Sequence, residues 1–275
     1  MPDKELTQET ILRECPRMGL GDRFVFECGK RMDCFTRCCA DVSIVLTPYD
    51  VLRLRRAVGL DSSEFLRRYT ISPFDREQKI PAVLLKMDQE SRACPFVTFA
   101  GCRVYADRPG ACRMYPLGLA EPRNATPDDS KFHFLIHEDF CHGHGQGSEL
   151  SVRDWLTGQG IDECDAGNAS FTAFMLDAAW DKAGDLTPAQ MDMYYMGCYD
   201  LDSFRRFVFE SRFLQLYEVD EARVEAMRTD DEELLEFAVM WLRWALFRQP
   251  TVKIKPSVLA DAKQRLAQAK THEVR

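Results

Sequence analysis

The sequence has no long hydrophobic run and no leader-like beginning. Its longest mostly apolar stretch, from Leu234 to Phe247, contains the charged residues Glu236 and Arg243. This stretch is shorter than the roughly 20 apolar residues that a membrane-spanning helix requires. Residues 1–8 are polar and lack an apolar run, so we expect no secretory signal. We therefore expect a cytoplasmic protein with no membrane partner.

Excess positive charge is also absent. The formal net charge is −8 at pH 7, and residues 146–275 carry all of it, because acidic and basic side chains balance in residues 1–145. An acidic half and the lack of a basic stripe argue against nucleic-acid binding. The uneven charge indicates two regions with different roles. The sequence shows no internal repeat and no low-complexity tract.

Cysteine, by contrast, is abundant, with 11 in the 275 residues. A chain of this length can bury a sizeable core and does not need disulfides to stabilise it. In a reducing compartment, clustered cysteines more often bind a metal or carry out redox chemistry. Eight of the cysteines are clustered, four of them between residues 28 and 39. We predict that these eight are metal ligands: Cys28, Cys34, Cys38, Cys39, Cys94, Cys102, Cys112 and Cys141.

The adjacent pair Cys38 and Cys39 bears on the number of metal centres. Neighbouring side chains usually point apart, so the two thiols are not expected to bind one mononuclear tetrahedral ion. Either they serve two centres, or one binds the metal and the other lies beside it. Eight thiolates suffice for two four-sulfur centres, or for one cluster with spare thiols. Such ligands suit zinc and iron–sulfur clusters, of which we favour a 4Fe–4S cluster.

Other residues near these cysteines are candidates for supporting roles. Basic side chains beside the ligands can lower thiol pKa values and donate hydrogen bonds to sulfur. They are Lys30, Arg31, Arg37, Arg103, Arg108 and Arg113. His142 and His144 could each complete a site of three cysteines and one histidine, although the cysteines already supply enough ligands. Cys164 and Cys198 lie on predicted helices and are expected in the core.

Local patterns predict an α+β fold with two domains, residues 1–147 and residues 148–275. The first domain is an irregular cysteine-rich metal-binding region with short strands and two helices. Strands are predicted at residues 23–26, 42–46, 80–87 and 132–136. One helix begins after a capping box at Thr47 and stops at Gly59, and the second, capped by Ser62 or Ser63, extends to Tyr69. The second domain is expected to be all-helical, because its apolar residues recur at helical spacing.

Motifs between residues 24 and 145 resemble the YkgJ-type cysteine-cluster family. They are Phe26-x-Cys28, Cys34-x3-Cys38-Cys39, Thr47-x2-Asp50, Cys94-Pro-Phe, Cys102-x-Val-Tyr105, Arg108-Pro109-x2-Cys112-Arg113-x-Tyr-Pro116 and the later Cys141. The gap between Cys28 and Cys34 is longer than in many members. The family is described as zinc- or iron-chelating with eight shared cysteines, so the resemblance implies metal binding through the eight cysteines named above.

Three functions remain in view. The first is an iron–sulfur protein with a redox or accessory role, such as an oxidoreductase component. The second is a structural zinc protein whose acidic helical region binds a protein partner. The third is a metal-dependent enzyme, because the cysteine segment is also distantly similar to that of flagellin lysine methylases. The chain has no glycine-rich nucleotide loop that would support S-adenosylmethionine binding.

Overall fold

The computed structural model describes residues 15–72, 80, 82–120, 131–261, 263 and 264. Its contacts divide the chain into two compact units. The first unit contains residues 1–59, 67–73 and 82–168, and the second contains residues 60–66, 74–81 and 169–275. In the C-terminal half of the chain the division between the two units falls within helix α6 (Ile161–Met175).

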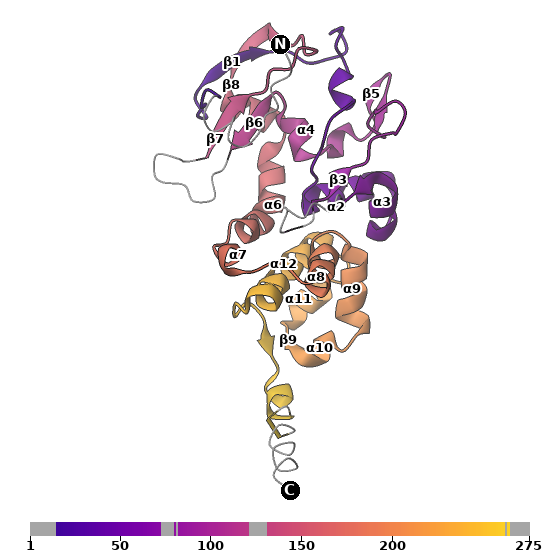
Figure 1. Cartoon of the computed structure of the whole chain (residues 1–275), viewed down its shortest axis with the longest axis vertical. Coiled ribbons are helices and arrows are strands. Elements are labelled where there is room, and N and C mark those ends of the chain that lie inside the picture. The colour runs from indigo at the N-terminus through magenta and orange to yellow at the C-terminus, as the bar shows by residue number, and fades with distance from the viewer. Residues whose placement is uncertain (1–14, 73–79, 81, 121–130, 262, 265–275) are drawn as a thin grey trace. The chain divides into compact units, whose positions relative to one another are not determined.

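The first unit combines short strands with short helices, as Figure 1 shows. Its elements are β1 (Arg23–Phe26), η1 (Arg37–Cys39), α2 (Pro48–Val58), β2 (Thr70–Ile71), β3 (Leu84–Leu85), β4 (Val97–Thr98), β5 (Gly101–Cys102), η2 (Tyr105–Asp107), α4 (Gly110–Met114), β6 (Leu117–Ala120), β7 (Phe132–Leu135), β8 (His144–Ser151), α5 (Val152–Gly158) and the start of α6. Helix α3 (Ser62–Tyr69) is divided between the two units. The α+β class expected from the sequence is confirmed.

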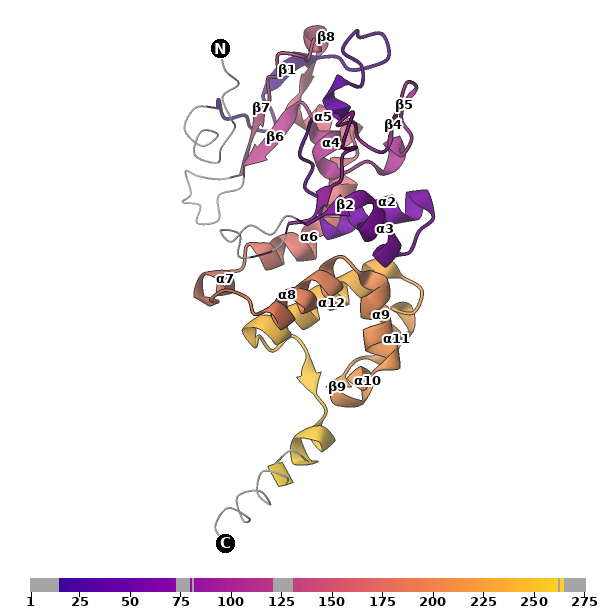
Figure 2. The ribbon, with the colours of Figure 1, turned by 45° about the vertical axis from the view of Figure 1, so that its right-hand side comes forward.

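The strands of the described residues form two-stranded antiparallel pairs. In the first unit β1 pairs with β8, β2 with β3, β4 with β5, and β6 with β7. In Figure 2 the β4–β5 hairpin stands apart from the β6–β7 pair. The β1–β8 register runs from Arg23 opposite Ser151 to Phe26 opposite His144, with an irregularity before Phe26. This pairing joins the two ends of the cysteine-rich segment.

Hydrophobic side chains from β1 and α5 form the core beside this pair. Phe24, Phe26, Leu117, Val152 and Ile161 are buried in one cluster. The Trp155 ring meets the Phe24 and Phe26 rings edge to face. Alternation along β1 directs both phenylalanines to one side of the strand, which is the pattern of a half-buried strand.

Helix α2 forms as its sequence predicts. The Thr47 side chain accepts a hydrogen bond from the Asp50 amide, the Asp50 carboxylate accepts one from the Thr47 amide, and Pro48 occupies the first turn. The helix ends at Gly59, whose φ of 68° is a left-handed conformation that glycine adopts without strain. The capping box and the C-terminal glycine were both expected, and both are confirmed.

Two local predictions were wrong. Residues 42–46 form only an isolated bridge between Val45 and Leu84 instead of a strand, because their partner β3 is two residues long and Val45 itself is 55% exposed. The second helix is capped by Asp61, which accepts a hydrogen bond from the Glu64 amide. The Ser62 hydroxyl instead donates to Asp200 within the second unit.

The second unit is helical, as predicted, with one additional short strand pair. Its elements are the end of α6, α7 (Ala179–Lys182), α8 (Pro188–Cys198), α9 (Leu201–Glu210), α10 (Phe213–Leu216), β9 (Tyr217–Glu218), α11 (Glu221–Ala226), α12 (Asp231–Phe247) and β10 (Lys253–Ile254), which pairs with β9. Aromatic rings of Phe204, Phe213 and Trp241 pack together in its core. Asp177 accepts hydrogen bonds from Arg243 and Gln249 and so joins the end of α6 to the end of α12.

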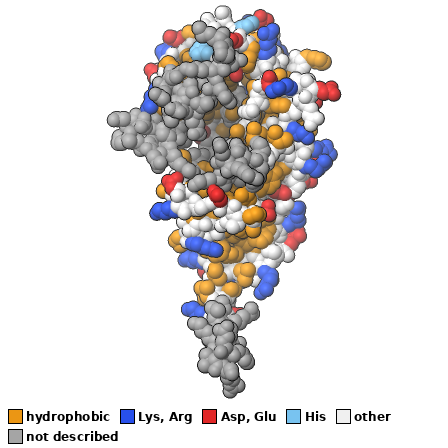
Figure 3. Space-filling view, viewed as in Figure 1, with side chains coloured by type: hydrophobic (Ala, Val, Ile, Leu, Met, Phe, Trp, Pro, Cys, Tyr) orange, Lys and Arg blue, Asp and Glu red, His pale blue; other side chains and the backbone are white. Residues whose placement is uncertain are grey.

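Within the described residues no helix combines the length and apolar character needed to cross a bilayer. On the face shown in Figure 3, acidic and basic side chains of the described residues are interspersed. The described residues visible on that face therefore form no large area of a single charge.

A close contact between α6 and α2 gives a test of the first unit. A Cβ atom at Gly167 would lie 2.5 Å from the ring of the buried Tyr49, whereas a Cβ at the exposed Gly158 would meet nothing within 4 Å. We expect Gly167→Ala to lower the free energy of unfolding by about 1–3 kcal/mol, because the ring cannot move without disturbing the core. Urea unfolding followed by circular dichroism measures the change.

The matched control is Gly158→Ala, which replaces a helical glycine in open space. This change should leave the stability unaltered or raise it by up to about 1 kcal/mol, because alanine loses less backbone entropy than glycine on folding. Equal destabilisation by both substitutions would contradict the close packing of α6 on α2.

Candidate metal centre

All eight predicted ligands lie in the first unit. Cys28 and Cys34 belong to the loop after β1, Cys38 and Cys39 to η1, Cys94 to the segment before β4, Cys102 to β5, Cys112 to α4, and Cys141 to the segment before β8. All are free thiols, of which Cys28 and Cys112 are exposed and the other six are half-buried. The site is therefore assembled from loops and short elements that the small strand pairs hold in place.

The β1–β8 pairing brings the first and last of these cysteines together. Beyond the pairing of Phe26 with His144, the Glu27 amide donates a hydrogen bond to the Gly143 carbonyl at 3.1 Å. A Cβ atom at Gly143 would collide with the Glu27 carbonyl oxygen, so this approach requires glycine. Burial and the neighbouring thiolates of Cys38, Cys141 and Cys34 raise the pKa of Cys28 to about 11.

A second set of backbone contacts gathers the cysteines in the middle of the segment. The Cys94 amide donates to the Cys39 carbonyl at 2.7 Å, and Ala40 forms a bridge with Ala93. The β4–β5 hairpin then places Cys102 opposite Val97. Residues 39–41, at the end of η1, are thus held against residues 92–94, before β4, by main-chain contacts and by the ion pair of Arg92 with Asp41.

Cys112, on helix α4, lies near the cysteines that these backbone contacts bring together, which are Cys39, Cys94 and Cys102. It is accessible at the surface, but the density of protein around its sulfur raises its pKa to about 12, with further contributions from Cys94, Asp50 and Cys102. Charge on Cys94 and Cys112 also raises the pKa of Cys39, after its hydrogen bond to Cys38 and its burial. The sulfurs of this set are therefore close enough to act on one another.

The adjacent residues Cys38 and Cys39 were expected to point apart, but their thiols are hydrogen-bonded to each other. The Cys39 thiol donates a hydrogen bond to Cys38 and thereby lowers the pKa of Cys38 to about 7. Cys38 is therefore the thiol of this pair that more readily carries negative charge.

Two sulfur atoms accept hydrogen bonds from backbone amides. The His142 amide donates to Cys34 Sγ at 3.4 Å, and the Phe96 amide donates to Cys94 Sγ at 3.5 Å. Amide donors of this kind stabilise a thiolate and are common around metal-bound cysteines. These hydrogen bonds thus favour the charged thiolate forms of Cys34 and Cys94.

No three of the eight described thiols lie as close together as the ligands of a mononuclear zinc site do. Four thiolates at about 2.3 Å from a tetrahedral zinc ion stand about 3.8 Å from one another. Among the described residues, the ligand group whose atoms all lie within 4.8 Å of one another is Asp33, Cys34 and His142. In that group His142 Nδ1 lies 2.7 Å from Asp33 Oδ1. The thiols alone do not form such a close group.

The second histidine considered as a ligand has different neighbours. The His144 ring lies 4.2 Å from the His137 ring, centroid to centroid, and meets the Phe26 ring edge to face. Burial and the neighbouring His137 lower the pKa of His144, which favours its neutral form. Cys164 and Cys198 are buried in the core, as predicted.

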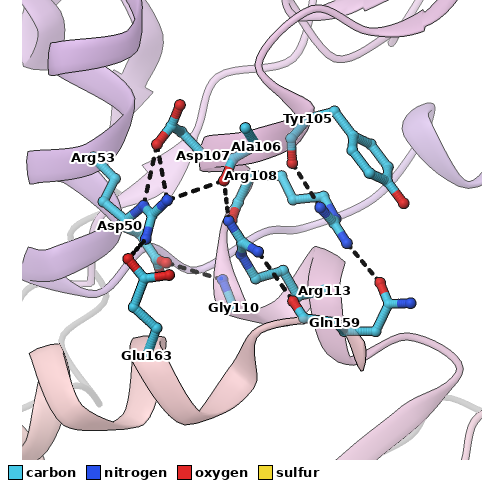
Figure 4. A network of polar contacts seen from close by, with 10 residues as sticks. All are labelled: Asp50, Arg53, Tyr105, Ala106, Asp107, Arg108, Gly110, Arg113, Gln159 and Glu163. Carbon is cyan, nitrogen blue, oxygen red and sulfur yellow. Dashed lines mark hydrogen bonds and ion pairs between the residues drawn. The ribbon is translucent and has the colours of Figure 1, made fainter. Parts of the chain in front are cut away.

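A polar network fixes the segment that carries Cys112 (Figure 4). Arg113, only 6% exposed, donates to the carbonyls of Arg108 at 2.9 Å and Gln159 at 3.0 Å, and also to the carbonyl of Ala106. One guanidinium therefore ties η2, the turn before α4 and the end of α5 together. The rigid fork of arginine suits this task, because its five donors have fixed directions.

Asp50 links helix α2 to helix α4 in the same network. Its carboxylate is 3% exposed and accepts hydrogen bonds from the Thr47 amide and from the Gly110 amide, each at 2.9 Å. It therefore caps α2 and also satisfies the first amide of α4. Burial raises the pKa of Asp50, and the hydrogen bonds from Thr47 and Gly110 oppose that rise.

Two further arginines complete the network. Arg53 donates to Asp107 at 3.0 Å and to the Ala106 carbonyl at 3.0 Å, and it forms an ion pair with Glu163. Arg108 donates to the Tyr105 carbonyl and lies over the Tyr105 ring at 3.8 Å. Figure 4 shows these side chains converging on the backbone between Tyr105 and Gly110.

Several residues of this network were not identified from the sequence. Gln159 and Glu163 lie beyond residue 147 and still support the cysteine segment. The second role of Asp50, at the start of α4, was also missed. No local spacing signals these contacts, because their partners lie far away along the chain.

The buried arginine gives a test of this arrangement. We expect Arg113→Lys to lower the free energy of unfolding by about 2–4 kcal/mol, because the carbonyls are bonded by three separate nitrogen atoms of the guanidinium. The single nitrogen of an ammonium group cannot occupy all three positions and leaves buried acceptors unpaired. Arg31→Lys is the control, because the Arg31 side chain is 90% exposed and its ion pair with Glu27 contributes little. Urea unfolding measures both, and equal stabilities would contradict the role of Arg113.

Comparison with known proteins identifies the segment that carries the cysteines. Residues 27–142 match a family model, CxxCxxCC, described as "Putative zinc- or iron-chelating domain". No match was found among the curated proteins or among the solved structures. The match confirms the cysteine-cluster family expected from the motifs, and it agrees with zinc or iron as the metal. The part of the chain between residues 27 and 142 is therefore similar to a cysteine-cluster domain described as zinc- or iron-chelating.

Proposed function

We propose that this domain holds an iron–sulfur cluster through its cysteine thiolates and serves a redox or accessory role. The observation that carries the proposal is the spacing of the sulfurs. No three of the eight described thiols belong to a group within 4.8 Å, whereas one zinc ion would require sulfurs about 3.8 Å apart. In a cluster each thiolate binds a different iron, so its sulfurs stand further apart.

The surroundings of the thiols also fit a cluster. Amide hydrogen bonds to Cys34 and Cys94 offset thiolate charge, as does the guanidinium of Arg108, which opposes the rise of the Cys28 pKa. The exposure of Cys28 and Cys112 leaves the site open to an electron-transfer partner. A bound cluster would supply one-electron transfer, and this chain's residues would hold it, balance its charge and limit its contact with water.

A structural zinc site is the second candidate, and one feature favours it. The strands between residues 84 and 102 are only two residues long, so a metal that links them would add stability. The acidic charge of residues 146–275 would then suit binding to a basic protein partner. In either case free thiols fit a reducing compartment such as the cytoplasm.

Metal analysis of the full chain tests the proposal. After anaerobic purification we expect iron and acid-labile sulfide in roughly equal amounts, with broad visible absorbance that dithionite bleaches. Cys94→Ser should lose iron and colour, because it removes a ligand that accepts an amide hydrogen bond. Cys15→Ser is the control, because Cys15 lies outside residues 27–142 and should keep all of the iron. A colourless protein that contains zinc and no sulfide would contradict the iron–sulfur proposal and support the structural site.

A further inference from the structure

We propose that Asp33, Cys34 and His142 bind one zinc ion at a site of their own. From the sequence, His142 was considered only as a partner of three cysteines, and Asp33 had no role. The site takes Cys34 out of the iron–sulfur ligand set, and seven of the eight predicted cysteines remain for a cluster that needs four thiolates. The inference therefore goes beyond the proposed function and does not depend on it.

The three side chains already lie close enough together to surround one ion. His142 Nδ1 is 2.7 Å from Asp33 Oδ1, and one ligand atom from each of the three residues lies within 4.8 Å of the other two. Ligands of tetrahedral zinc, at bond lengths of about 2.0–2.3 Å, stand roughly 3.3–3.8 Å from one another. The ligand atoms therefore need to shift by only about 1 Å to coordinate the ion.

The backbone holds Asp33 and Cys34 in two consecutive turns after β1. The Phe35 amide donates a hydrogen bond to the Met32 carbonyl at 3.0 Å, which closes the first turn. The Arg37 amide donates to the Cys34 carbonyl at 2.9 Å, which closes the second. These main-chain bonds position both side chains without the help of an ion.

The backbone also fixes His142 from both sides. A turn closed by the Cys141 amide precedes it, and the Gly143 carbonyl after it accepts a hydrogen bond from the Glu27 amide at 3.1 Å. The His142 amide itself donates to Cys34 Sγ at 3.4 Å. A surface ion pair would need only the carboxylate and the imidazole, whereas this amide contact brings a sulfur atom to the pair as a third donor.

The chemistry of the donors suits zinc. Zinc binds carboxylate oxygen, thiolate sulfur and imidazole nitrogen, and open sites hold it with three protein ligands and one water. One carboxylate and one thiolate balance the charge of the divalent ion. When the ion binds, the Nδ1 proton of His142 moves to Nε2 by way of solvent, and the Cys34 thiol releases its proton to solvent. The amide donor at Cys34 then stabilises the thiolate.

Zinc analysis of the full chain tests this site. The side chains of His142 and Asp33 are 45% and 73% exposed, so replacing either should leave the fold intact. Wild-type protein that is purified anaerobically, incubated with zinc sulfate and desalted should retain about one zinc ion per chain more than Asp33→Ala or His142→Ala does. Each substitution should weaken zinc binding at this site by at least about 100-fold, because loss of a group that only supports a ligand already costs about 10–100-fold.

The matched controls are Asp139→Ala and His137→Ala. Both residues are exposed and lie outside the group of three ligands. Each control should retain as much zinc as the wild type, and a control that loses the same zinc ion would overturn the assignment of ligands.

Iron measured in the same samples separates this site from the proposed function. Zinc lost in both ligand variants with iron unchanged supports the site. Equal zinc in wild type and variants, or no zinc retained by the wild type, overturns it. Loss of iron together with zinc also overturns it, because the residues would then belong to the cluster. Wild-type protein that lacks iron, with zinc still lost in both variants, overturns the iron–sulfur proposal and leaves this site in place.

X-ray absorption at the zinc edge gives a second measurement that needs no variant. A first shell with about one sulfur and at least two nitrogen or oxygen ligands supports the site. A shell made of sulfur alone contradicts it.

Discussion

The antiparallel pairing of β1 with β8 is the contact on which the cysteine domain depends. It joins Phe26 to His144, which are far apart along the chain, and so closes a long loop that carries the remaining cysteines. Closing such a loop costs conformational entropy, which the main-chain hydrogen bonds and the buried rings of Phe24, Phe26 and Trp155 offset. Without this pairing Cys28 and Cys141 would not lie close together in space. The closeness of these cysteines is therefore a property of the tertiary fold.

Electrostatic repulsion is the second constraint on the site. Burial and neighbouring thiolates raise the pKa of Cys28 to about 11, and Cys112 behaves similarly. Without metal these thiols are therefore protonated at neutral pH, and binding a metal must displace their protons. Amide donors to Cys34 and Cys94 reduce the cost of the resulting negative charge. The Arg108 guanidinium likewise opposes the rise of the Cys28 pKa.

The hydrogen-bond network around Arg113 shows how other parts of the first unit hold the cysteine-bearing segments in place. Arg113 and Asp50 hold backbone groups on three segments, and neither side chain is exposed enough to act as a surface ligand. Gln159 and Glu163 reach the same network from α5 and α6, beyond the segment that the family model matches. The support of the cysteine segment therefore extends further along the chain than its motifs do. The helical unit forms a separate core around Phe204 and Trp241.

The sequence by itself determined the helix caps, the strand alternation and the helices, because the interactions that produce them are between residues close together in the chain. The capping box at Thr47, the stop at Gly59, the alternation in β1 and the helices of the second unit all follow from residues within a few positions of one another. The density of cysteines was also enough to indicate a metal site and its family. Only the tertiary structure decided that β8 pairs with β1, that residues 42–46 make a single bridge, and that Asp50 caps two helices. It likewise decided which cysteines are neighbours, because that depends on main-chain contacts between distant segments, and sequence spacing does not encode such contacts.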